Sequence, residues 1–173
     1  MISNAENQPG ASADAVTMRA VEPEDENFLI AVYGTTRADE LSAVPWTAKQ
    51  REAFIRFQFA AQTRHYQTEY PEARHQIVLF QQQPVGRLYV DRRAHEIRIL
   101  DLTILPEHGG AGIDAQLIRQ LMSEAARAGL PLTIQLESFN PARELFAQLG
   151  FVPVAEFGFR TLFEWRAAAI RTD

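Results

Sequence analysis

The stretch 101-DLTILPEHGGAGIDAQLIRQLMSEAARAG-129 combines an apolar run, a proline, a glycine-rich turn and a helical pattern. It predicts a strand, then a loop, then a helix over 113–128 that Gly129 ends as a C-cap. A loop of this kind typically cradles phosphate, because its backbone N–H groups and the helix dipole both attract anions. Asp114, however, stands where the anion would lie.

The composition is that of one compact domain. The 173 residues are 46% hydrophobic and 23% charged, and the formal net charge is −5. A nucleic-acid surface needs concentrated positive charge, so we expect no nucleic-acid partner. The chain has no cysteine, which excludes disulfides, thiolate metal sites and cysteine nucleophiles. No apolar run reaches the length of a membrane span, and the N-terminus lacks the pattern of a signal peptide, so we expect a cytoplasmic protein with no membrane partner.

The rest of the sequence predicts a single domain over 16–173, preceded by a disordered tail over 1–15. The tail is small and polar, and it cannot bury enough apolar surface to offset the entropy of ordering. The predicted strands are 16–21, 75–81, 85–91, 96–105, 131–137, 151–157 and 159–165, with a turn at 82–84. One helix is predicted to begin near residue 23, and three more are predicted over 46–70, 113–128 and 140–150.

A second motif, 140-NPARELFAQLGF-151, predicts a short helix with Asn140 at its N-cap, Pro141 at its first position and Gly150 at its end. Together with the junction 102-LTILPEHGGAGI-113 and the order of elements, it resembles the GNAT superfamily of N-acetyltransferases over nearly all of 16–165. The resemblance implies an α/β (α+β) fold: a mixed sheet of six to seven strands, flanked by about four helices and splayed at the strand before the glycine loop.

The resemblance also implies acetyl-coenzyme A as cosubstrate, no metal, and transfer of acetyl to a primary amine of a small molecule or protein. In the family, the pyrophosphate lies on the loop and the pantetheine arm pairs with the preceding strand. The matching cofactor-binding positions are Thr103, Ile104 and Leu105 on the strand, Gly110, Ala111, Gly112, Ile113, Asp114 and Ala115 in the loop and helix, and Asn140 and Phe146 in the short helix.

The chain departs from the family pattern at three positions. Gly109 replaces an Arg or Gln in the loop, Asp114 replaces a small residue, and Phe146 replaces a tyrosine that in many members protonates the leaving thiolate. A carboxylate beside a pyrophosphate can lower its affinity on the order of a hundredfold. Alternatively, Asp114 points into solvent and leaves the backbone cradle intact. His108 could replace the missing Arg or Gln, or it could simply be exposed.

Two carboxylates are candidates for the general base. Strand alternation over 96–104 places Glu96, Arg98, Leu100 and Leu102 on one face and Ile97, Ile99, Asp101 and Thr103 on the other. Asp101 thus interrupts an apolar face close to the loop and is the first candidate, and Glu137 is the second. The alternatives are a buried acid satisfied by hydrogen bonds and a solvated strand end.

One face of the helix over 46–70 could bind the amine acceptor. It carries the polar residues Gln58, Gln62, His65, Tyr66 and Glu69 at helical spacing, and Tyr89 on a nearby strand could border the same pocket. A solvated helix face is the alternative.

Two functions therefore remain open. The first is a coenzyme-A-dependent N-acyltransferase, which the Asn-led helix and the strand–proline–loop junction favour. The second is a non-catalytic descendant that keeps the fold as a binding or interaction module, with weak or no coenzyme A binding, which the three departures favour. The sequence identifies neither the acceptor nor the oligomeric state, and it is compatible with a homodimer.

Overall fold

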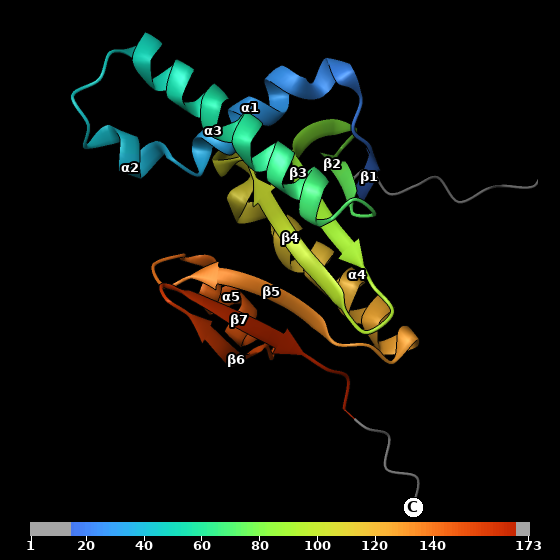
Figure 1. Cartoon of the computed structure of the whole chain (residues 1–173). Helices are drawn as coiled ribbons and strands as arrows, with labels where there is room; N and C mark the ends of the chain where they lie inside the picture. Colours follow the sequence, from blue (N-terminus) through green and yellow to red (C-terminus); the bar gives the residue numbers. More distant parts are fainter. Residues whose placement is uncertain (1–14, 169–173) are drawn as a thin grey trace, which may run out of the picture.

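The computed structural model describes residues 15–168, so 1–14 of the predicted tail and 169–173 lie outside the described residues. Over this range, seven strands form one sheet in the order β1-β2-β3-β4-β5-β7-β6 (Figure 1). They are β1 (Val16–Ala20), β2 (Arg74–Phe80), β3 (Gln83–Arg92), β4 (Ile97–Ile104), β5 (Leu132–Glu137), β6 (Val152–Phe157) and β7 (Arg160–Trp165). Of these seven strands, only β4 and β5 are parallel neighbours. The predicted mixed sheet is confirmed.

Helices cover both faces of the sheet. On one side lie α1 (Glu26–Thr35), α2 (Ala38–Ser42) and α3 (Ala48–Glu69), with α3 crossing β2 to β4 (Figure 1). On the other side lie α4 (Ile113–Ala128) and α5 (Ala142–Gln148). Two short 3-10 helices, η1 (Pro23–Asp25) and η2 (Pro106–Ala111), precede α1 and α4. No described helix is both long enough and apolar enough to cross a membrane.

The core has two parts, one on each face of the sheet. The larger cluster packs α4 and α5 against β3, β4, β5 and β7, through residues such as Leu88, Ile99, Leu117, Ile134 and Phe163. The smaller cluster packs α1 and α3 against β2, through Leu29, Tyr33, Phe59 and Ile77. The sheet is thus packed against apolar side chains of helices on both of its faces.

Local sequence signals explain the two long helices. Thr47 begins α3 with a capping box: its hydroxyl accepts the Gln50 N–H at 3.2 Å, and Gln50 Oε1 accepts the Thr47 N–H at 2.9 Å. A stripe of buried residues, from Ile113 to Ala125, holds α4 on the core. Gly129 ends α4 in the left-handed conformation, with φ of 66°, as its glycine predicts.

Two local predictions are wrong. The β2–β3 hairpin turns at Gln81 and Gln82, with φ of 50° and 64°, and not at 82–84. Two glutamines carry none of the Asn-Gly signal of such turns, so the sequence misplaced the turn. Pro84 instead lies within β3, next to Val85, which is skipped in the register with β2. The short helix α2 was not predicted at all, because five residues carry too little periodicity.

Candidate active site

The strands β4 and β5 separate part-way along their length. They pair only where Ile97–Ile99 faces Leu132–Ile134, whereas β4 continues to pair with β3 as far as Ile104. The opening between β4 and β5 is visible in Figure 1. Beyond Ile99, the edge of β4 that faces β5 therefore has no strand partner among the described residues, which is the splay that the GNAT resemblance implied.

Alternation decides which backbone groups face this opening. The Leu105 N–H donates to the Val85 carbonyl at 2.8 Å, so Leu105 is turned toward β3. Backbone groups of an antiparallel strand alternate in direction, so Thr103 is also turned toward β3, while Leu102 and Ile104 face the opening. Of the three predicted strand positions, Ile104 is the one that presents backbone polar groups to a ligand.

A bulge in β4 corrects the predicted faces of this strand. Tyr89 pairs with Asp101 and Val90 pairs with Ile99, so Leu100 is skipped in the register with β3. An extra residue shifts the alternation by one. Ile97 and Ile99 therefore pack into the large core, whereas Asp101 and Thr103 lie on the opposite face, under α3. The prediction that these four residues share a face is wrong.

Asp101 is held in a buried ion pair. The Arg87 guanidinium donates from Nη2 to Asp101 Oδ2 at 2.8 Å and from Nε to Oδ1 at 3.3 Å. Thr103 Oγ1 also donates to Oδ1, at 2.8 Å, and Gln62 Oε1 of α3 accepts a further bond from Arg87 at 2.6 Å. The Arg87 side chain is only 1% exposed and that of Asp101 is 14% exposed. Three donors therefore share the acceptor sites of this carboxylate.

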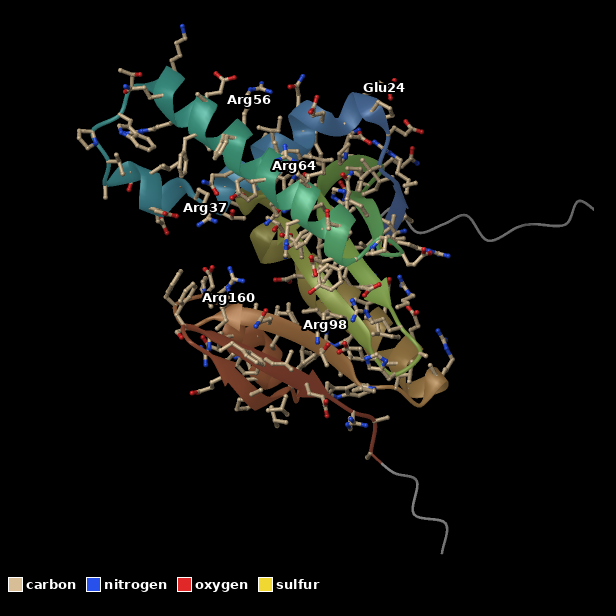
Figure 2. All side chains as sticks on the ribbon, in the orientation of Figure 1. Glu24, Arg37, Arg56, Arg64, Arg98 and Arg160 are labelled. Carbon is tan, nitrogen blue, oxygen red and sulfur yellow. The ribbon has the colours of Figure 1, made fainter. Side chains whose placement is uncertain are left out.

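Glu137 is in a more open setting. It ends β5 and pairs with Arg160 of β7 in the sheet register. The closest approach of the two side chains is long, at 3.7 Å, and the Glu137 side chain is 30% exposed. Figure 2 shows Arg160 on the β7 side of the opening and Arg37 on the helical side. The Glu137 carboxylate thus keeps more acceptor sites for a ligand or water than that of Asp101.

An aromatic cluster lies beneath α3, beside the ion pair. Tyr66 of α3 donates its hydroxyl to the Leu100 carbonyl in the bulge at 3.1 Å, and burial raises the pKa of this tyrosine. The Tyr66 ring also packs edge-on against Tyr89, which stacks on the ring of His75 with centroids 4.4 Å apart. Burial, reinforced by the charge of Arg87, lowers the pKa of His75 to about 4.

The predicted acceptor-binding face of α3 divides into two. Gln62 and Tyr66 point toward the sheet, where they bond Arg87 and Leu100. His65 and Glu69 are exposed, and Gln58 is half-buried. Tyr89 is 7% exposed, so it supports Tyr66 from below. The structure thus brings Gln62, Tyr66 and Asp101 together.

The loop ahead of α4 is wound into the 3-10 helix η2, and the His108 N–H donates to the Leu105 carbonyl at 2.9 Å. Gly112 joins η2 to α4 with φ of 70°. The Asp114 carboxylate folds back on its own helix, and Oδ1 accepts the N–H of Ala115 at 2.8 Å. One of the N–H groups predicted to cradle phosphate is therefore already bonded to an anion.

The Asn-led motif forms a short helix that begins one residue later than predicted, with Pro141 at its N-cap and Ala142 as its first residue. Asn140 Oδ1 accepts the Ala142 N–H at 2.9 Å, at the start of α5. Phe146 is 2% exposed and packs edge-on against Phe151, with ring centroids 5.0 Å apart. Phe146 is thus a core residue that offers no proton.

The comparisons with known proteins agree with this geometry. A family model described as "Acetyltransferase (GNAT) domain" matches residues 43–162, well over half of the chain. The chain belongs to the GNAT acetyltransferase family. The PaiA N-acetyltransferase from Thermoplasma acidophilum, solved in complex with coenzyme A, superposes with a TM-score of 0.67 at 14% identity, over 88% of this chain and 99% of that one.

Other solved structures share the GNAT fold. An acetyltransferase from Thermus thermophilus has a TM-score of 0.63 at 20% identity, over 88% of this chain and 97% of that one. A protein titled histone acetyltransferase HPA2 and related acetyltransferase, from Corynebacterium glutamicum, has a TM-score of 0.61 at 17% identity, over 91% and 99%. No curated protein matches the sequence.

The residues of this GNAT chain fit one half of coenzyme A and not the other. The free edge of β4 can bond the amide groups of the pantetheine arm as an added strand would. The N-terminus of α4 does not fit the diphosphate, because the Asp114 carboxylate bonds there. Among the described residues, no cluster of three or more His, Asp or Glu could hold a metal ion.

Sequence reasoning missed two residues of this site, Arg87 and His75. Arg87 interrupts the apolar run 85-VGRLYVD-91 of a strand that is buried along most of its length. A charge in such a strand usually has a buried partner, and this signal could have identified the pair with Asp101. His75 begins a predicted strand, and nothing in the sequence indicates its stacking on Tyr89.

Proposed function

We propose that this GNAT chain is an N-acyltransferase that transfers acetyl from acetyl-coenzyme A to a primary amine of a small molecule or peptide. The observation that carries the proposal is the free edge of β4 beyond Ile99. Unpaired backbone groups next to a helix N-terminus suit an extended thioester arm, because both its amides find partners there.

The proposed reaction needs a neutral amine. The amine nitrogen attacks the thioester carbonyl carbon, the C–N bond forms, and the C–S bond breaks, so that one proton passes from nitrogen to sulfur overall. We assign Glu137 as the base that accepts the amine proton, directly or through water, because its carboxylate is partly exposed and only loosely paired. Phe146 supplies no proton, so solvent protonates the thiolate.

Asp101 has a different proposed role. Its carboxylate already accepts bonds from Arg87 and Thr103, so we assign it as a positioning residue that fixes Arg87 beneath α3. Arg87 in turn bonds Gln62, and Gln62 and Tyr66 are the proposed acceptor-side residues. The acceptor would enter between α3 and the Glu137 end of β5.

The test is product formation by the full chain. The protein is incubated with millimolar acetyl-coenzyme A and a panel of primary amines that includes a diamine, an aminoglycoside, amino acids and a peptide. Mass spectrometry then detects the acetylated amine, and a thiol reagent detects the free thiol. The proposal expects at least one amine to gain an acetyl group in step with thiol release. A folded protein that produces neither above background would overturn it.

The second candidate is a non-catalytic GNAT-fold module, and the observation that favours it is the Asp114 carboxylate on the Ala115 N–H. This candidate expects no turnover and no binding of coenzyme A, even in an Asp114→Ala variant. Calorimetry on the wild type and that variant separates the two candidates.

A further inference from the structure

The helix end that should hold the diphosphate is negatively charged in this chain. Between 106 and 115 the sequence carries two carboxylates, Glu107 and Asp114, and no Lys or Arg; His108 is the only residue there that can become cationic. Asp114 lies in the first turn of α4, with Oδ1 2.8 Å from the Ala115 nitrogen. The dipole of α4 stabilises this carboxylate, as it would an external anion.

The two halves of coenzyme A therefore meet opposite conditions. The pantetheine arm is neutral, and it needs only the amide partners that β4 offers at Leu102 and Ile104. The diphosphate needs free N–H groups and positive charge, and here it would instead meet a carboxylate in direct competition for the Ala115 N–H. The Asp114 carboxylate and a diphosphate at the same N–H would be two negative charges in close contact, and such charges repel strongly near a protein surface.

We propose that Asp114 is an internal anion that occupies the diphosphate position, so that the site selects its acyl donor by the pantetheine arm. The site then takes acyl thioesters of pantetheine and 4′-phosphopantetheine about as well as the coenzyme A thioester, because the diphosphate adds little affinity. This inference rests on the proposed function and specifies the donor that the same site takes.

The test measures binding by calorimetry with three probes: pantetheine, 4′-phosphopantetheine and coenzyme A. In the wild type, coenzyme A is expected to bind no more than about tenfold more tightly than pantetheine. In Asp114→Ala, coenzyme A is expected to bind roughly a hundredfold more tightly than to the wild type, the factor expected for relief of a close like-charge contact. Pantetheine should change less than about twofold, because it never reaches residue 114.

Two further variants separate charge from structure. Asp114→Asn keeps an oxygen for the Ala115 N–H but removes the charge, so it should recover most of the gain. Glu26→Gln removes an exposed carboxylate from the first turn of α1, far along the chain from this loop, and should leave the affinities of all three probes unchanged. Thermal unfolding of each variant checks that the fold is intact.

The outcomes distinguish this inference from the proposed function. If coenzyme A binds the wild type more than about a hundredfold more tightly than pantetheine, or if Asp114→Ala and Asp114→Asn leave its affinity unchanged, the inference on Asp114 is wrong while the acyltransferase proposal stands. If neither protein binds any probe at millimolar concentration, the proposed function itself fails. Thiol release from acetyl-pantetheine that equals or exceeds that from acetyl-coenzyme A would support both.

Discussion

Arg87 and Asp101 form a two-point ion pair beneath α3, with donor–acceptor distances of 2.8 and 3.3 Å. The pair joins adjacent strands at the bulge of β4, and Gln62 ties it to the helix above. Because the Arg87 side chain is almost completely buried, its charge depends on Asp101 for compensation. The pair therefore fixes the geometry of β4 where the strand leaves β5.

Loss of either partner should destabilise the fold strongly. Asp101→Ala leaves an uncompensated buried charge, and we expect it to lower the free energy of unfolding by about 3–5 kcal/mol. The double variant Arg87→Met with Asp101→Leu replaces the pair by apolar side chains, and it should lose much less than the sum of the two single variants. Urea unfolding of the wild type, the single variants Arg87→Met and Asp101→Leu, and their double variant measures the coupling.

Glu156→Ala serves as the control, because Glu156 is exposed on β6 and should change the free energy of unfolding by less than about 0.5 kcal/mol. If Asp101→Ala changes the free energy of unfolding no more than this control does, the Arg87–Asp101 ion pair does not stabilise the fold.

Stability should fall on mild acidification because of His75. Its pKa is about 4 in the folded chain, against an ordinary value of 6.5. Between these pH values the unfolded chain binds a proton at His75 and the folded chain does not. The free energy of unfolding therefore falls by on the order of 1–3 kcal/mol as the pH is lowered from about 6.5 to about 4. His75→Phe keeps a ring against Tyr89 and should remove most of this loss.

A second acid-labile group acts in a different pH range. The hydrogen bond from Arg19 lowers the pKa of Asp25 from 3.8 to about 2, so its contribution is lost only between those values. Urea unfolding at pH 7, 6 and 5 therefore separates His75 from Asp25, and also from Glu124, whose pKa the hydrogen bond from Arg92 lowers from 4.5. An equal loss of stability in His75→Phe over this range would rule out the histidine as its source.

Gly86 is required for the close approach of β3 to β4. A Cβ at this position would lie 2.2 Å from the Thr103 carbonyl oxygen, so Gly86→Ala should push the strands apart and cost about 3 kcal/mol. Gly109→Ala is the matched control, because its Cβ would meet no atom within 4 Å. Thermal unfolding compares the two, and equal unfolding temperatures would contradict the close packing at Gly86.

Glu137→Gln tests the assigned base. If this carboxylate accepts the amine proton, the variant should lower kcat about 10²–10⁴-fold at neutral pH while KM for the acyl donor stays unchanged. Glu164→Gln on the adjacent strand is the control, because Glu164 is also a strand carboxylate beside an arginine, Arg166, but lies away from the opening. A kcat for Glu137→Gln equal to that of the control would reassign the base.

Most of the fold could be predicted from the sequence because its signals are local. The capping box at Thr47, the buried stripe of α4 and the glycine at its end each fix an element through neighbouring residues. The GNAT resemblance then supplied the mixed sheet and its splay before the glycine loop, which no local pattern contains. The turn at Gln81 and Gln82 was missed because it has no such local signal: glutamine is not a typical residue of a left-handed turn.

The candidate site was predictable only in part, because long-range pairing decides it. The bulge at Leu100 moves Asp101 to the other face of β4, and no alternation rule reveals where a strand gains a residue. The partner of Asp101 comes from a different strand. Likewise, the sequence identified Asp114 as an anomaly but left its direction open, and the Ala115 bond resolves it.

The most direct test of the central claim, that the free edge of β4 binds a thioester arm, is amide hydrogen exchange with and without saturating pantetheine. Exchange at Leu102 and Ile104 should slow by about tenfold or more, because each N–H gains a hydrogen bond, while Thr103 and Leu105, already turned toward β3, should change little. Unchanged exchange at Leu102 and Ile104 in the presence of bound pantetheine would contradict the account.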